Sequence, residues 1–71
     1  MSSTTALVTY QSGYQVQRVF NNVGNAGALQ EQLQAAARTT DGLLGVGTVD
    51  GHDAVINVHR VIDVQAQTYN P

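Results

Sequence analysis

The pattern of hydrophobic and polar positions divides the chain into three structured segments. In the first, β-branched, apolar and aromatic residues fill much of residues 5–20, and Ser12 and Gly13 interrupt them. Two runs of this kind separated by a short glycine turn are typical of a β-hairpin. The sequence therefore predicts a hairpin over about residues 5–20, with Val16 and Phe20 on its apolar side.

The second segment has helical periodicity. From about Ala26 the chain is rich in Ala, Leu and Gln, which are good helix formers. Its apolar residues recur at the spacing of one helix face, namely Leu29, Leu33, Ala36 and Ala37. Asn22 or Asn25 could cap the start, and Asp41-Gly42 could provide the stop. We expect a helix over about residues 26–39 that lies close against a sheet.

The third segment predicts a second hairpin with a long last strand, over about residues 43–67. Asp50-Gly51 is a strong turn signal between its two runs. Gly45 and Gly47 lie on one side of the first run, which suggests close approach of other backbone there, from the helix or from a neighbouring subunit.

The run after this turn, residues 53–67, is long for a strand. It holds fifteen residues without glycine or proline, whereas strands usually have about 5 or 6. Its even-numbered residues are apolar except Arg60, its odd-numbered residues are mostly polar, and this alternation requires no bulge. The preceding run can pair with only its first half, so residues 61–67 need another partner.

Three arrangements would supply that partner. The second half could bend over and pair with the N-terminal strand of its own chain, closing a small barrel. It could instead pair with another subunit. Alternatively, His59-Arg60 could form a short turn that joins two ordinary strands.

Together these segments predict a single α+β domain, β-β-α-β-β, with an antiparallel sheet or small barrel and one helix packed on it. A domain of 71 residues buries a modest core, and small domains often add disulfides, a metal or a partner subunit. The chain has no cysteine, so we expect a homo-oligomer. The expected interface lies in the last strand, at Val61, Ile62, Val64, Gln65 and Ala66.

The composition favours protein contacts over catalysis. Charged residues make up 11 %, lysine is absent, and the net charge is −2. No serine stands in a nucleophile motif such as G-x-S-x-G, and GLLGVG lacks the lysine of a phosphate loop. Asp50, His52 and Asp53 are interpreted as a solvated turn rather than a metal site. We expect no enzyme activity, no catalytic residues, no metal and no cofactor.

Nucleic acid is not the expected partner, because binding usually needs a basic surface. The alternative is a small oligomeric barrel that binds RNA or a nucleotide between subunits. Its anion contacts would be Arg18 and Arg60, with Tyr10 and Tyr14 available for stacking.

The expected function is non-catalytic assembly or interaction, through copies of the chain itself or another protein. A small virion or capsid-associated structural protein, or an inhibitor that covers a partner's surface, would fit. Residues 1–10 have no basic start and no long apolar run, and nothing approaches a membrane span. We therefore expect no membrane contact, no secretion by a signal peptide, and a cytoplasmic or virion location. Gln15, Gln17, Gln65 and Gln67 are expected to form a neutral polar sheet face.

Overall fold

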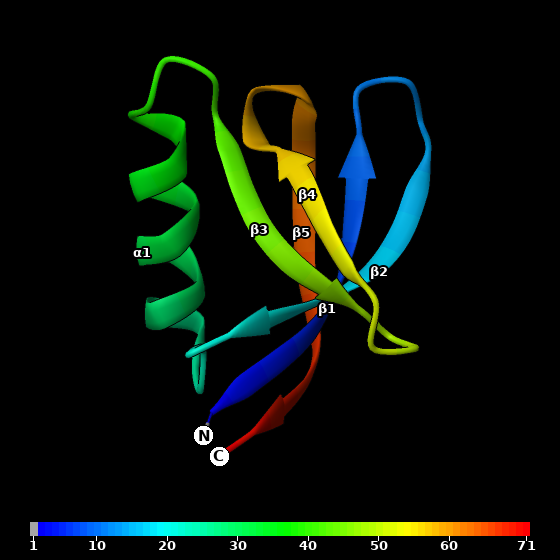
Figure 1. The fold of residues 1–71 in the computed structure, drawn as a ribbon, viewed down its shortest axis with the longest axis vertical. Coiled ribbons are helices and arrows are strands. Elements are labelled where there is room, and N and C mark those ends of the chain that lie inside the picture. The colour runs from blue at the N-terminus through cyan, green and yellow to red at the C-terminus, as the bar shows by residue number, and fades with distance from the viewer. Residues whose placement is uncertain (1) are drawn as a thin grey trace.

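The computed structural model describes residues 2–71 and shows the predicted α+β layout, with a fifth strand at the end (Figure 1). The elements are β1 (Ser3–Tyr10), β2 (Gln15–Asn21), α1 (Ala26–Ala37), β3 (Leu43–Thr48), β4 (Asp53–Asn57), the 3-10 turn η1 (Val58–Arg60) and β5 (Val61–Asn70). The two predicted hairpins and the helix are all present. The helix ends two residues earlier than predicted.

All five strands form one antiparallel sheet in the order β4-β3-β2-β1-β5. The sheet is strongly curved but open, and β4 and β5 are its two edges (Figure 1). The chain therefore does not close a barrel. Because β5 returns to pair with β1, the two ends of the chain lie side by side, with Ser3 opposite Asn70.

The long last strand is not continuous. Asn57 ends β4, and its side-chain oxygen accepts a hydrogen bond from the His59 amide at 3.0 Å, which favours the turn η1. The prediction of one strand over residues 53–67 is thus wrong, and a turn at His59-Arg60 joins two ordinary strands. The second of these strands pairs with β1 of the same chain, so its pairing does not require another subunit.

The predicted alternation of apolar and polar residues is also interrupted. The turn η1 and two register shifts change which face of the sheet the following side chains occupy. Tyr10 pairs with Val61 and Thr9 with Asp63, so Ile62 has no opposite residue. Val61 consequently packs against the core, whereas Ile62, predicted to share the apolar side, is 64 % exposed. The second shift lies between the pairs Ala6–Ala66 and Thr5–Thr68 and leaves Gln67 as the extra residue.

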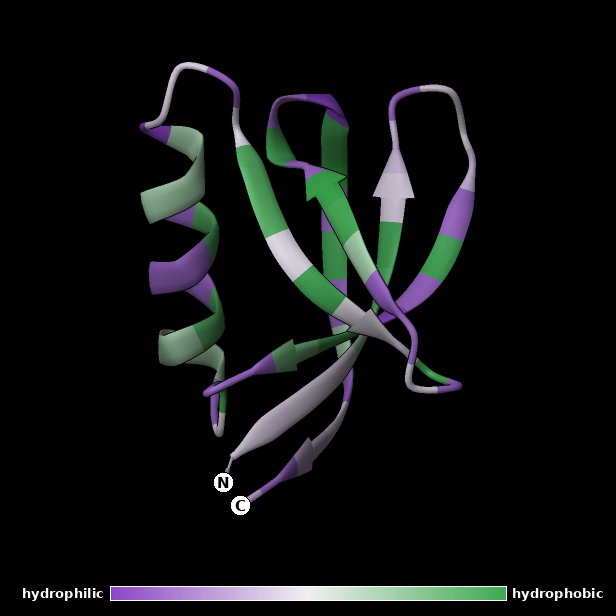
Figure 2. Ribbon diagram, viewed as in Figure 1, coloured by the Kyte–Doolittle hydropathy of each residue, from purple (hydrophilic) through white to green (hydrophobic). Residues whose placement is uncertain are grey.

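The core lies on the concave face of the sheet, beneath α1. In β2 and β3, Phe20 and Val46 are buried on this face, whereas their neighbours Asn21 and Gly45 are exposed. Figure 2 shows apolar segments interrupted by polar residues or glycine along both strands. Its buried members are Ala6, Val8, Phe20, Val23, Leu29, Val46 and Ile56.

The helix packs where its sequence predicted, but not against the glycines of β3. Asn25 is the N-cap, since its side-chain oxygen accepts a hydrogen bond from the Ala28 amide at 2.9 Å. Asn22, the other candidate cap, adopts a positive φ of 61° in the loop. A Cβ atom at Gly45 would meet nothing within 4 Å, and one at Gly47 would lie 3.6 Å from Val19. The prediction that the helix approaches this glycine face is therefore wrong.

A buried hydrogen bond fixes the loop that leads into the helix. The Thr4 hydroxyl, which is fully buried in β1, donates to the Val23 carbonyl at 2.7 Å. Replacing Thr4 with valine leaves this buried carbonyl unpaired, and we expect it to lower the free energy of unfolding by about 1–3 kcal/mol. Urea unfolding followed by circular dichroism measures the loss.

The matched control is Thr5→Val on the opposite, partly exposed face of β1, which we expect to change stability by less than about 0.5 kcal/mol. Equal effects of the two substitutions would show that the bond to Val23 contributes nothing.

Candidate interaction groove

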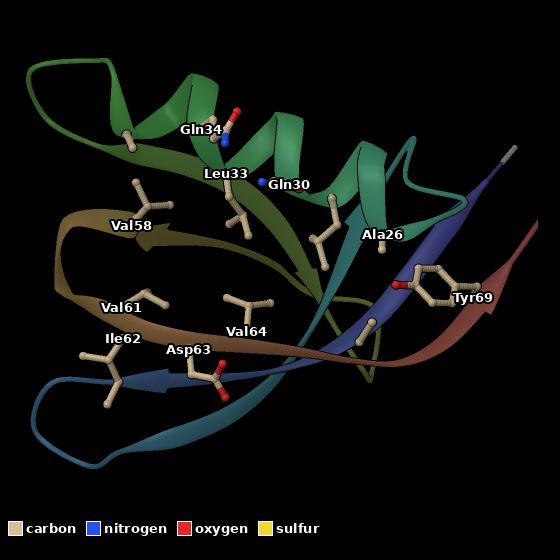
Figure 3. Close-up of a pocket in the computed structure, with 13 residues that line it drawn as sticks. Ala26, Gln30, Leu33, Gln34, Val58, Val61, Ile62, Asp63, Val64 and Tyr69 are labelled. Atoms are coloured by element: carbon tan, nitrogen blue, oxygen red, sulfur yellow. The ribbon is translucent and has the colours of Figure 1, made fainter.

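An apolar groove runs between α1 and β5 (Figure 3). It has a volume of about 620 Å³ and is open to solvent along its length. The groove is lined by Ala26, Leu29, Gln30, Leu33, Gln34, Ala37, Val58, Val61, Ile62, Asp63, Val64, Ala66 and Tyr69. Asp63 is the one charged residue in this lining.

The helix side of the groove follows from the period of α1. Residues three or four apart share a helix face, and Leu29, Leu33 and Ala37 have this spacing. Leu29 is buried in the core, whereas Leu33 packs against the edge of the core and projects into the groove. The buried residues of the helix are thus Leu29 and Ala36, and Leu33 contributes apolar surface to the groove.

The C-terminal end of α1 is fixed to the turn between β4 and β5. His59 Nε2 lies 3.1 Å from the Ala37 carbonyl oxygen, and since a carbonyl can only accept, this nitrogen donates. The same imidazole ring lies against Gly42, and the Val58 amide donates to the Gly42 carbonyl at 2.9 Å. These contacts set the position of the helix relative to the start of β5.

The strand side is formed by one face of β5. Val64 pairs with the buried Val8 and Ala66 with the buried Ala6, so both point to the concave face. Figure 3 shows Val61 and Val64 pointing toward α1, and Ile62 and Asp63 pointing to the other side of the strand at the groove's rim. One edge of β5 bonds to β1, and no strand among residues 2–71 pairs with its other edge.

Four of the five predicted interface residues line this groove: Val61, Ile62, Val64 and Ala66. The fifth, Gln65, lies opposite Leu7 on the outer face of the sheet. The helix residues of the groove and Tyr69 are missing from the predicted set. The apolar stripe of α1 was the available signal for the helix residues, but only the pairing of β5 with β1 places that stripe beside β5.

The predicted glutamine face is present on the convex side of the sheet. Gln17 Nε2 donates to Gln67 Oε1 at 2.9 Å, across the intervening strand β1. Gln15 Nε2 donates to the Thr9 hydroxyl at 3.2 Å. This face therefore links β2, β1 and β5 through neutral side chains.

The candidate anion contacts do not form one site. Tyr10 and Tyr14 stack with ring centroids 5.9 Å apart, and the Gln11 amide bonds to the Arg60 carbonyl next to them. Arg18 pairs instead with Ala6 and Thr48. Ala6 and Gln11 are five residues apart along the chain, about 16 Å, so the backbone of Arg18 lies beside the middle of β1 and that of Arg60 lies beyond its end.

The turn after β3 carries the residues interpreted above as solvated. His52 Nε2 lies 3.9 Å from Asp50 Oδ2, and both side chains are largely exposed. A hydrogen bond from the Thr48 hydroxyl lowers the pKa of Asp50 below its usual value. Over residues 2–71, no three His, Asp or Glu side chains gather as a metal-binding group.

Comparisons with known proteins found no match that would suggest a function. No protein-family model matches the chain, and searches of curated proteins and of solved structures found no similar protein. Within residues 2–71, no helix is long and apolar enough to span a membrane.

Proposed function

We propose that this protein is a non-catalytic assembly protein that binds copies of itself through the α1–β5 groove. The observation that carries the proposal is the free edge of β5, a ten-residue strand that borders an open apolar groove. A structural component of a larger particle, such as a small virion protein, would use a surface of this kind. So would an inhibitor that covers a protein partner, in the cytoplasm or within a particle.

The free strand edge supports this proposal. An unpaired edge presents a row of backbone N–H and C=O groups that can pair with another chain, and monomeric proteins usually protect such edges with lysine, proline or short strands. Residues 61–70 contain neither lysine nor proline. Between the irregularities at Ile62 and Gln67, the edge therefore retains a regular segment that can pair.

The chemistry of the surroundings also favours a protein partner. Aliphatic side chains from α1 and β5 supply apolar area that association would remove from water. Asp63 is the one charged residue of the lining, and the nearby glutamines are neutral. The outer face and the groove can thus both be covered without burying several charges.

The test is the native mass in solution, measured by light scattering behind a sizing column over a wide range of concentrations. We expect a defined oligomer for the natural chain and loss of this oligomer in Ile62→Asp, because the new carboxylate would be buried next to Asp63. Ile62 is 64 % exposed within one chain, so the substitution should leave the fold intact.

The matched control is Val55→Asp on the other edge strand, at a residue that is 61 % exposed. We expect this variant to remain assembled. A natural chain that stays monomeric at every concentration would refute the proposal, and so would loss of assembly in Val55→Asp alone. Absorbance at 260 and 280 nm on the same peak would reveal bound nucleic acid, which the proposal does not expect.

A further inference from the structure

We propose that the occupant of the β5 edge is β5 of a second copy, paired antiparallel about a two-fold axis at Gln65. This inference rests on the proposed self-assembly and gives it a geometry. The two open sheets would join through their β5 strands into one continuous sheet. A two-fold contact of this type is self-complementary, because each residue meets its counterpart in the same environment.

The regular part of β5 determines the centre of this pairing. The two register shifts of the β1–β5 pair fall at Ile62 and at Gln67. Between them, Asp63, Val64, Gln65 and Ala66 pair in unbroken order with β1. Gln67 extends the polar side of this run, since its side chain bonds to Gln17 on the outer face. The regularly alternating segment is therefore residues 63–67, with Gln65 in the middle.

The sequence of this segment is symmetric in polarity about Gln65. Asp63 and Gln67 are polar, Val64 and Ala66 are apolar, and Gln65 lies between them. Antiparallel pairing about Gln65 therefore places Asp63 of one copy opposite Gln67 of the other, and Val64 opposite Ala66. A two-fold axis perpendicular to the sheet also keeps each side chain on its own face, so apolar residues remain on the groove side.

The distribution of charge favours this register over a neighbouring one. Like charges placed directly opposite each other destabilise a strand pair. Centring the pair on Asp63, the one charged residue of β5, would oppose two carboxylates. Centring it on Gln65 opposes each carboxylate with a neutral amide that can donate a hydrogen bond to it.

The other edge strand is a weaker candidate for the same role. β4 has five residues, of which Asp53 begins the strand and Asn57 ends it, whereas β5 has ten residues. The regular part of β5, residues 63–67, is also five residues long, but the strand continues on both sides of it. The apolar groove also borders β5.

Single-cysteine variants test this geometry directly, because the natural chain contains no cysteine. Directly opposite residues of an antiparallel pair have Cβ atoms about 4.5–5.5 Å apart, close to the separation that a disulfide spans. Under mild oxidation, Gln65→Cys should convert most of the protein to a covalent dimer on a non-reducing gel. Asp63→Cys and Gln67→Cys should each remain monomeric on the gel when alone, because their own counterparts lie about 14 Å away.

A mixture of Asp63→Cys and Gln67→Cys should form the mixed dimer, since these positions are opposite each other in the proposed pair. Val55→Cys on β4 is the control and should not cross-link. If the natural chain assembles but Gln65→Cys fails to cross-link, or if Val55→Cys cross-links instead, the strand pairing is wrong while self-assembly stands. A monomeric natural chain would refute both.

Discussion

Replacing Gly42 with alanine is expected to lower the free energy of unfolding by about 1.5–3.5 kcal/mol. Gly42 has a φ of +65°, a conformation that costs a residue with a Cβ atom about 1–2 kcal/mol. In addition, the new Cβ atom would lie 2.8 Å from the imidazole ring of His59. The ring would have to swing away, which breaks its hydrogen bond to the Ala37 carbonyl and adds about 0.5–1.5 kcal/mol.

Two other glycines separate these contributions. Gly13 has a φ of +91° but open space around it, so Gly13→Ala should show the backbone cost alone. Gly45 has neither constraint, and Gly45→Ala should be close to neutral. Urea unfolding of the three variants at one protein concentration gives the comparison. If Gly42→Ala and Gly13→Ala are equally destabilised, the contact with His59 has no energetic role.

Replacing Ile56 with alanine is expected to lower the free energy of unfolding by about 2–5 kcal/mol, the usual range for a fully buried aliphatic side chain. Ile56 is 0 % exposed and lies in the core formed with Phe20 and Val46. A domain of this size is stable by about 4–10 kcal/mol in total. The substitution therefore removes a large part of the free energy of unfolding, and thermal unfolding should occur at a markedly lower temperature.

Val55 provides the control for this prediction, since it precedes Ile56 in β4 and points to the opposite face. It is 61 % exposed, and Val55→Ala should change stability by less than about 1 kcal/mol. If the two variants lose similar amounts of stability, Ile56 is not the buried residue and Val55 not the exposed residue of β4.

Local signals were sufficient for most of the fold. Ser12-Gly13 and Asp50-Gly51 mark two turns, and Asn25 marks the start of the helix, because each acts through its own backbone or its nearest neighbours. The layout of two hairpins around one helix follows from these signals and from hydrophobic periodicity. The fold class could therefore be predicted from the sequence.

Features that depend on contacts distant in sequence could not be predicted in the same way. The turn at Val58–Arg60 was one of three arrangements that the sequence left open, because besides the local bond to Asn57 it depends on the bonds of His59 and Val58 to Ala37 and Gly42, about twenty residues earlier in the chain. This turn changes the phase of the alternation, so Val61 rather than Ile62 packs against the core. Of the groove, only residues of the last strand were predicted. Its helix side could not be predicted, because the contacts between His59 and Ala37 that place α1 beside β5 join segments distant in sequence.

The pairing of β1 with β5 also has a consequence for the order in which the chain can fold. Ser3 pairs with both Asn21 and Asn70, so β1 acquires its second neighbour only when β5, residues 61–70, is present. During synthesis, β1 and β2 can form a hairpin early, while the other side of β1 waits for β5. Strand pairing between such distant segments is slow, and an unpaired inner strand is prone to aggregate. A nascent chain is therefore most vulnerable just before residues 61–70 leave the ribosome.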